Sequence, residues 1–226
     1  MDHELFMTLL GVVFGALIAI VIVVAVENLR RPKLELRIAA VPADARYGDG
    51  KPAKTGRYVG LNLINKSLPW YARWMARNAA LQCRGAISFH HLDGQRIFFA
   101  DMPVRFGGTP EPVPMLINIG GVSGVLADPI RLTADSRIDV YPGEKAALDV
   151  AARFDSDADC YGWSNLSYFS DPPWRHPDWR LPRGRYLIKA TVSSSGEKCS
   201  EIFRLLNEGS LKDFRLEPAL PTDKTQ

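Results

Sequence analysis

The chain has 226 residues, of which 46% are hydrophobic and 23% are charged, and this ordinary composition excludes wholesale disorder. Its 28 basic and 25 acidic side chains leave a formal charge of +3, an excess too small and too scattered to indicate a nucleic-acid-binding protein. Three cysteines, Cys83, Cys160 and Cys199, form no CxxC pair, which excludes a densely disulfide-bonded domain and favours buried free thiols in a reducing compartment.

The first element in chain order is an apolar segment close to the N-terminus. Residues 6–26 are 21 consecutive residues without a charged side chain. At a rise of about 1.5 Å per residue they span about 30 Å, the thickness of the hydrocarbon core of a bilayer. A signal peptide has a basic start and a shorter apolar segment, whereas this chain starts with the acidic stretch MDHEL. The pattern predicts an uncleaved transmembrane helix over residues 6–26, after a short extracytoplasmic tail, residues 1–5.

Charged residues beside the apolar segment predict its orientation. No Lys or Arg precedes the segment, whereas Arg30, Arg31 and Lys33 lie in the linker that follows it, residues 27–33. Basic flanks stay on the cytoplasmic side of a membrane. We therefore expect a single-pass protein of the plasma (inner) membrane, with its N-terminus outside and its C-terminal domain in the cytoplasm.

Small residues recur within the apolar segment. Gly11 and Gly15 form a GxxxG motif, and Ala19 extends the same spacing. Such a stripe lets two helix backbones approach closely, which favours a homodimer through the membrane helix. Glycine is also frequent in membrane helices that do not pair, so both interpretations stay open.

Beyond residue 33 the hydrophobic pattern changes to a period of two, which is typical of half-buried strands. In residues 81–92 one predicted face is apolar and consists of Leu81, Cys83, Ile87 and Phe89. Alternating segments of this kind cover residues 33–38, 57–65, 81–92, 139–154, 185–192, 199–207 and 212–217.

These segments predict a mainly β fold, namely an antiparallel β-sandwich over residues 34–217. Two long insertions interrupt the pattern, one near residues 101–137 that is rich in Pro and Gly, and one near residues 155–180 that is rich in aromatic residues. The composition of residues 218–226 predicts a disordered tail.

One segment near the C-terminus resembles a known family of sandwiches. LPRGRYLI, residues 181–188, is similar to the Leu-x-x-Gly-x-Tyr segment of immunoglobulin-like and fibronectin-type domains, with Leu181, Gly184 and Tyr186 at the matching positions. In that family the tyrosine hydroxyl ties the chain back to a preceding corner. Ile188 departs from the pattern, because it stands where an antibody-type domain carries its second core cysteine.

Further segments resemble strands of CARDB-like modules, a bacterial adhesion-type family with this kind of fold. The resemblance covers about 100 of the 226 residues. It implies an immunoglobulin-like fold and a tendency towards binding, and it implies no chemistry. The matching segments are residues 60–67, which include Asn65, residues 76–83 and residues 141–150.

Candidate chemistry is sparse. Asp155, Asp157 and Asp159 alternate in DSDADC, a spacing that could begin a calcium loop. Cys160 and Leu166 replace the glycine and the glutamate of such a loop, so a solvated acidic turn is favoured.

Zinc and nucleophilic sites are not indicated either. His90 and His91 are adjacent in a predicted strand and point to opposite faces. The sequence contains no GxSxG, GxxxxGK[ST] or HExxH motif. We predict a protein without catalytic activity, cofactor or metal.

Aromatic and basic residues are interleaved in PWYARWMARN, residues 69–78. Two functional interpretations are a hot spot for a protein partner and a contact to anionic lipid headgroups near the anchor. A third is structural, with the rings packed over one end of the sandwich and the arginines stacked on them. The residues concerned are Trp70, Tyr71, Arg73, Trp74 and Arg77.

Together these features predict a membrane-anchored protein whose cytoplasmic β-sandwich is a protein-interaction or scaffolding module. The expected partners are the lipid bilayer, an unidentified protein and a second copy of the membrane helix, with no nucleic acid. An extracytoplasmic adhesion or ligand-binding module of the same fold is the alternative, and a metal-dependent enzyme is the third.

Overall fold

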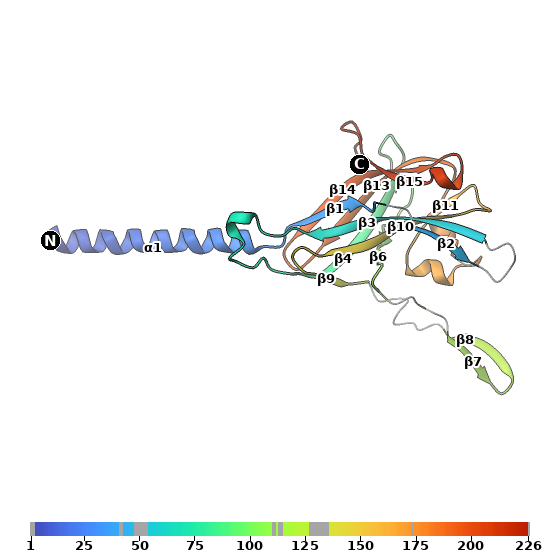
Figure 1. Ribbon diagram of the computed structural model, residues 1–226, viewed down its shortest axis with the longest axis horizontal. Helices are drawn as coiled ribbons and strands as arrows, with labels where there is room; N and C mark the ends of the chain where they lie inside the picture. The colour runs from blue at the N-terminus through green and yellow to red at the C-terminus, as the bar shows by residue number, and fades with distance from the viewer. Residues whose placement is uncertain are drawn as a thin grey trace.

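A computed structural model describes residues 3–40, 43–47, 54–109, 112, 115–126, 136–172 and 174–225. One long helix projects from a β-rich body, which lies entirely at the C-terminal end of that helix (Figure 1). The tail expected over residues 1–5 begins with Met1 and Asp2, which lie outside the described residues.

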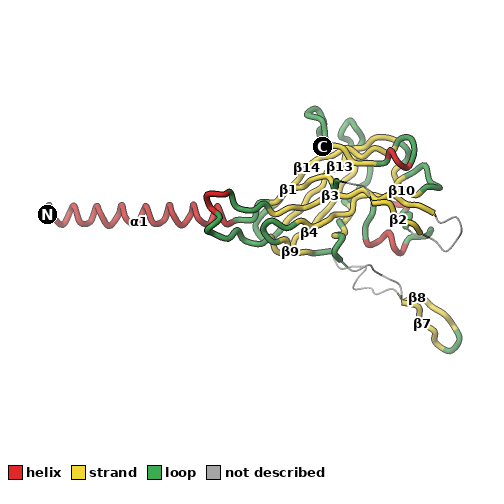
Figure 2. The backbone as a smooth tube through the Cα atoms, viewed as in Figure 1, coloured by secondary structure: helices red, strands yellow, loops and turns green. Residues whose placement is uncertain are grey.

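The helix α1 spans His3–Arg30. Its segment Phe6–Arg30 is long and apolar enough to cross a membrane, and none of its most apolar window is buried inside the protein. Figure 2 shows the helix extending away from the strands and loops. The β-rich body therefore does not cover the apolar surface of α1.

The first sheet is antiparallel throughout, and its central pair joins β3 (Lys54–Asn65) to β10 (Lys145–Phe154). On one side of this pair lie β1 (Leu34–Ile38), which pairs with β3, and β2 (Ala43–Tyr47), which pairs with β3 further along. On the other side lie β6 (Arg105–Phe106), β11 (Cys160–Gly162) and β12 (Arg180–Leu181).

The second sheet is also antiparallel and centres on β13 (Gly184–Ser193), which pairs with β4 (Ala80–His90) and β14 (Lys198–Asn207). Its edges are β15 (Arg215–Pro218), β5 (Met102–Pro103) and β9 (Ile138–Val140).

A separate hairpin, β7 (Met115–Ile119) and β8 (Val122–Leu126), projects from the body (Figure 1). Gly120 and Gly121 connect its strands with φ values of 62° and 84°. Two successive positive φ angles characterise the type I′ turn, a two-residue turn whose twist matches a hairpin. Residues 110–111, 113–114 and 127–135 of the same predicted insertion lie outside the described residues.

Alternating residues of both sheets meet in one hydrophobic core, so the two sheets form two layers of one domain. Each long strand supplies its inward-facing side chains, in agreement with the period-two pattern. Fully buried members include Leu61, Leu63, Leu148 and Val150 from the first sheet and Ile87, Ile188, Ala190 and Val192 from the second. The mainly β class with two antiparallel sheets and one N-terminal apolar helix is confirmed.

The insertion of residues 155–180 contains β11 and two 3₁₀ helices, η2 (Asn165–Phe169) and η3 (Pro177–Trp179). Aromatic rings hold it against the first sheet: Trp163 is 5% exposed, and its ring centroid lies 4.9 Å from that of Tyr58. A third 3₁₀ helix, η4 (Leu211–Asp213), precedes β15.

The C-terminal tail differs from the disorder that its composition predicts. The side chain of Asp223 is only 5% exposed and accepts two hydrogen bonds of 2.7 Å from the guanidinium of Arg204 on β14. The Asp223 carboxylate also accepts a hydrogen bond from the Leu220 backbone amide. This bidentate pair ties the tail to the second sheet.

Candidate functional site

The aromatic and basic residues predicted to form a site lie in a loop between β3 and β4, residues 66–79, which we call the aromatic loop. Pro69 precedes a short 3₁₀ helix, η1 (Trp70–Ala72), with an extended backbone. The amide of Ala72 donates to the Pro69 carbonyl over 2.9 Å, and that of Met75 donates to the Ala72 carbonyl over 3.0 Å. Only Ala72 of this turn is buried, so the turn directs its larger side chains outward.

The rings of the aromatic loop are exposed. Trp70 and Trp74 are each 80% exposed and Tyr71 is 61% exposed. The Trp70 and Tyr71 ring centroids lie 5.9 Å apart in an edge-to-face arrangement. Rings that capped the sandwich would be buried, so this exposure does not fit the packing interpretation. It leaves a surface of large apolar rings that a partner or a membrane can cover.

Hydrogen bonds join the aromatic loop to the C-terminal end of α1. The amide of Asn78 donates to the Arg30 carbonyl over 2.7 Å, and Nη1 of Arg77 donates to the Arg31 carbonyl over 2.7 Å. The last carbonyls of a helix have no partner within the helix. The aromatic loop therefore caps α1 and fixes its own position beside the helix end.

Asn65, at the end of β3, holds this junction from inside. Its side chain is fully buried, and its amide nitrogen donates to the carbonyls of Asn78 and Val140 over 3.1 Å each. Its side-chain oxygen accepts a hydrogen bond of 3.2 Å from the backbone amide of Lys33. One side chain thus links the linker after α1, the end of the aromatic loop and β9.

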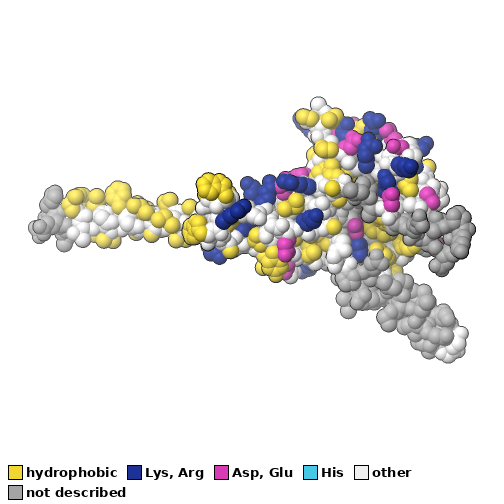
Figure 3. All heavy atoms as spheres, in the orientation of Figure 1, with side chains coloured by type: hydrophobic (Ala, Val, Ile, Leu, Met, Phe, Trp, Pro, Cys, Tyr) yellow, Lys and Arg dark blue, Asp and Glu magenta, His cyan; other side chains and the backbone are white. Residues whose placement is uncertain are grey.

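Basic side chains of the linker and of the aromatic loop meet at this end of the domain. Arg31, Lys33 and Arg73 are exposed, and Arg30 and Arg77 are half-buried. Figure 3 shows hydrophobic and basic side chains gathered where α1 joins the body. The structure therefore brings together two sets of residues that are distant in the sequence, the cations predicted to set the topology and the aromatic loop, as the hydrogen bond between Arg77 and Arg31 across 46 positions shows.

The small residues of α1 lie apart from this junction. A side chain placed at Gly11 or Gly15 would meet no described atom within 4 Å. Both glycines and Ala19 are exposed. Pairing of two such helices stays a prediction.

The corner predicted from LPRGRYLI is formed. The Tyr186 hydroxyl donates a hydrogen bond of 2.8 Å to the Pro182 carbonyl, four residues upstream, and Leu181 is fully buried. A Cβ at Gly184 would lie 3.3 Å from the Tyr186 hydroxyl, so glycine leaves room for the ring. Burial raises the pKa of Tyr186 to about 12, which keeps the hydroxyl a donor.

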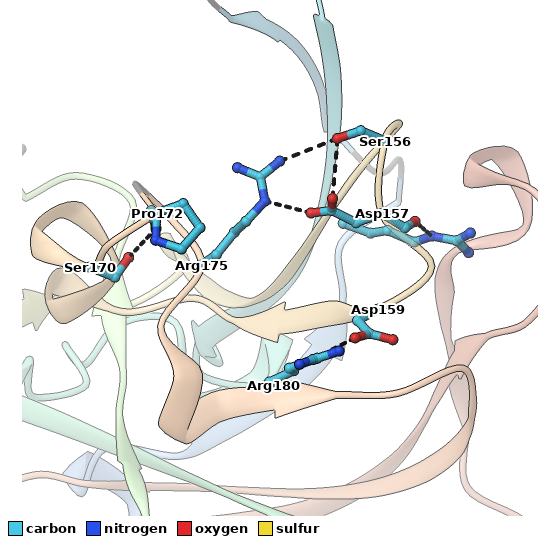
Figure 4. Close-up of polar contacts among 8 residues, drawn as sticks. Ser156, Asp157, Asp159, Ser170, Pro172, Arg175 and Arg180 are labelled. Carbon is cyan, nitrogen blue, oxygen red and sulfur yellow. Dashed lines mark hydrogen bonds and ion pairs between the residues drawn. The ribbon is translucent and has the colours of Figure 1, made fainter.

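The acidic turn pairs with arginines. Oδ2 of Asp157 accepts from Nε of Arg175 over 2.6 Å, and Oδ2 of Asp159 accepts from Nε of Arg180 over 2.5 Å (Figure 4). Oδ2 of Asp155 accepts from the backbone amide of Thr55. Each carboxylate is therefore directed at a protein donor. Among the described residues, no group of three or more His, Cys, Asp or Glu side chains is placed to hold a metal ion.

Cys83, Cys160 and Cys199 are all free thiols. Cys83 and Cys160 are fully buried, and Cys199 is half-buried at the edge of the core. Burial raises the pKa of all three thiols, that of Cys83 to about 11. A thiol with a raised pKa is a poor nucleophile at neutral pH.

A polar cavity that the sequence did not predict lies on the outer face of the second sheet. It has a volume of about 420 Å³. Strand register brings its residues together, and the only signal in the sequence is that each strand carries polar residues at alternate outward positions. The lining includes Ser88, His90, Arg96, Asp101, Lys189, Thr191, Lys198 and Ser200.

No known family model, curated protein or solved structure matches this chain.

Proposed function

We propose that this protein is a single-pass membrane protein whose β domain is a cytoplasmic protein-interaction module, held at the bilayer surface by the aromatic loop. The supporting observation is the capping of α1 by Asn78 and Arg77, which sets the exposed rings of the loop beside the helix end. The proposed site consists of Trp70, Tyr71, Arg73, Trp74 and Arg77.

Helix length supports a place for the aromatic loop among the lipid headgroups. The 25 residues Phe6–Arg30 extend about 37 Å at 1.5 Å per residue. A bilayer measures about 30 Å across its hydrocarbon core and about 40–45 Å with its headgroups. The Arg30 carbonyl would then lie at headgroup depth, and the amide of Asn78 is 2.7 Å from it.

The chemistry of the loop suits that depth. Trp and Tyr are enriched at membrane interfaces, where their rings meet both apolar chains and water. Exposed cations close to the surface gain about 1 kcal/mol each from an anionic leaflet. Arg31, Lys33 and Arg73 are exposed, and the linker and the loop that carry them are joined by hydrogen bonds at the end of α1, so rings and cations would bind the same layer.

The basic flank of α1 supports the cytoplasmic side for the domain. The Tyr186 corner, with its hydroxyl bonded to the Pro182 carbonyl, supports the finer proposal that the domain is an immunoglobulin-like sandwich. Such folds are used widely for binding, although a fold alone implies no partner.

A second surface favours a protein partner away from the bilayer. Ala80 begins β4 next to the aromatic loop, and the strand ends at His90, about 33 Å further on. In the segment that follows β4 and turns back along it, the ring of Phe99 is fully exposed and Leu92 is 47% exposed. An exposed aromatic ring beside the C-terminal half of β4 is typical of a protein contact.

Fluorescence quenching in vesicles tests the membrane contact. The full chain is reconstituted in vesicles that contain lipids with a quencher at headgroup depth. We expect quenching of tryptophan emission that disappears in the double variant Trp70→Phe, Trp74→Phe. Of the other three tryptophans, Trp163 and Trp179 are buried, and Trp174 is half-buried and stacked on Phe154. Equal quenching in the wild type and in the double variant would refute the contact.

A C-terminal reporter tests the orientation. A fluorescent fusion that folds only in the cytoplasm should be bright, and a phosphatase fusion that needs export should be inactive. An active phosphatase would overturn the cytoplasmic assignment and favour an extracytoplasmic adhesion or ligand-binding module.

A further inference from the structure

The cavity on the outer face of the second sheet combines cationic and hydroxyl side chains. Ser88 and His90 come from β4, Lys189 and Thr191 from β13, and Ser200 from β14. Backbone register sets Ser88 opposite Lys189 and Thr191 opposite Ser200. The five side chains therefore project from adjacent strands into one cavity of about 420 Å³.

His90 lies at the end of this cavity and is held on both sides. Its Nδ1 is 3.0 Å from the Gly94 carbonyl, and its Nε2 is 2.9 Å from the Ser88 hydroxyl. A carbonyl only accepts hydrogen bonds, so Nδ1 carries the proton. In the neutral ring Nε2 is then an acceptor, and the Ser88 hydroxyl must donate its hydrogen to it.

The cavity has an excess of positive charge. Arg96 pairs with Asp101 at its wall, which leaves Lys189 and Lys198. Among the described residues, no acidic side chain forms an ion pair with either lysine. Burial lowers the pKa of His90, and the positive charges of Arg96 and Lys189 lower it further, so the ring is neutral while the cavity is empty.

A hydroxyl pair supplies a further donor. The oxygens of Thr191 and Ser200 lie 2.9 Å apart, and either can be the donor. Whichever hydroxyl donates, the other keeps its own hydrogen for a ligand. The cavity therefore offers two ammonium groups and at least one free hydroxyl hydrogen, which together suit a group with several anionic oxygens.

We propose that this cavity binds a small soluble ligand through a phosphate group, and that His90 takes up a proton when the ligand binds. Protonation would turn Nε2 into a donor towards the Ser88 oxygen, which frees the Ser88 hydrogen to bond the ligand. The negative charge of the ligand would also offset the repulsion from Arg96 and Lys189. Asp101 is the one acidic side chain in the lining, and its pairing with Arg96 reduces its repulsion of an anion.

The position of the cavity favours a soluble ligand over a lipid. Ser88 lies eight residues along β4 from Ala80, which adjoins the aromatic loop. At about 3.3 Å per residue that is about 26 Å, further than a headgroup reaches from the bilayer surface.

Calorimetry on the full chain in a phosphate-free maltoside detergent tests the proposal, with sulfate as the probe. Sulfate is tetrahedral and keeps its charge between pH 6 and 8, so any change in its affinity reports on the protein. We expect tighter binding at pH 6 than at pH 8, by at most about tenfold for each unit by which binding raises the pKa of His90. Glycerol phosphate should compete with sulfate. If micellar phosphatidic acid competes and glycerol phosphate does not, the ligand is a lipid and the proposal of a soluble ligand is refuted.

Matched variants separate this cavity from general attraction to a basic protein. Lys189→Gln should weaken sulfate binding at least tenfold, and Lys212→Gln, at an exposed lysine outside the cavity, should leave it unchanged. Equal effects of the two variants would overturn the site.

Two variants on β4 test the proton uptake. His90→Gln should keep binding but abolish its pH dependence, and an unchanged pH dependence would overturn the coupling. If His90→Gln does not fold, Ser88→Ala decides, because it retains the imidazole and removes the hydroxyl. A pH dependence in Ser88→Ala equal to that of the wild type would overturn the coupling through the Ser88 hydroxyl.

Discussion

Replacing Asn65 by alanine tests the junction between α1 and the aromatic loop. The substitution removes hydrogen bonds to the carbonyls of Asn78 and Val140 and from the amide of Lys33. The bond to Val140 is buried and the other two are partly buried. A buried polar group left without a partner costs about 1–3 kcal/mol.

The expected loss is the sum over these three groups. With about 2 kcal/mol for the buried carbonyl of Val140 and about 1 kcal/mol for each group that water can reach, Asn65→Ala should lower the free energy of unfolding by about 4 kcal/mol. Asn65→Asp retains the acceptor but sets a carboxylate oxygen against two carbonyl oxygens. It should cost at least as much.

Denaturant unfolding of the full chain in detergent, followed by circular dichroism of the strands, measures the loss. Asn62→Ala is the matched control, because Asn62 lies on the same strand and is half-exposed, and surface substitutions stay within about 0.5 kcal/mol. A loss below about 1 kcal/mol for Asn65→Ala would refute the argument that this side chain holds the junction.

Three further substitutions test single features by the same unfolding assay. Trp74→Ala should cost under about 1 kcal/mol, because the ring is 80% exposed, and a loss above about 3 kcal/mol would mean that the ring is packed. Tyr186→Phe should cost about 0.5–1.5 kcal/mol through the lost corner hydrogen bond, and no loss would show that the corner is dispensable. Hydrogen bonds from Arg37 and Lys66 lower the pKa of Glu35 from 4.5 to about 2, so its contribution to stability is present above about pH 4.5 and is lost as the pH falls towards 2. Glu35→Gln should therefore flatten the acid dependence in that window, and an unchanged slope would contradict this assignment.

The long strands could be predicted from the sequence because they contain enough residues for alternation to be recognised. β3, β10, β13 and β14 have 10 to 12 residues each, and their inward-facing side chains follow a period of two. β5, β6 and β12 have two residues each. No periodicity exists over two residues, so these edge strands depend on the sheet that they join.

One residue of the predicted core face of β4 was assigned wrongly, and the backbone explains why. Leu81 was predicted to face the core with Cys83, but it is 44% exposed and Ala80 is fully buried instead. The register of β4 against β9 shifts between Ala80 and Cys83, and Gln82 between them has a φ of 54°. A bulge of this kind turns neighbouring side chains to the other face.

The aromatic loop could be predicted from the sequence only in part. The sequence PWYARWMARN shows which residue types the loop contains, but it does not show that their side chains are exposed, because exposure depends on contacts with residues far away in the chain. Asn65 reaches Val140, 75 residues on, and Arg77 reaches back 46 residues to Arg31. Contacts over such separations follow from the fold and from no local pattern.

The cavity illustrates a different limit. In a two-layered domain, polar residues at outward positions of a strand are expected to be solvated, and Ser88 and His90 have this spacing. Both are nevertheless buried, at 9% and 2% exposure. The chain after β4 turns back, so that Arg96 bridges to His90 and pairs with Asp101. A solvated histidine would titrate without a ligand, whereas burial and the charges of Arg96 and Lys189 lower the pKa of His90. The proposal that an anionic ligand drives proton uptake by His90 rests on this difference in environment.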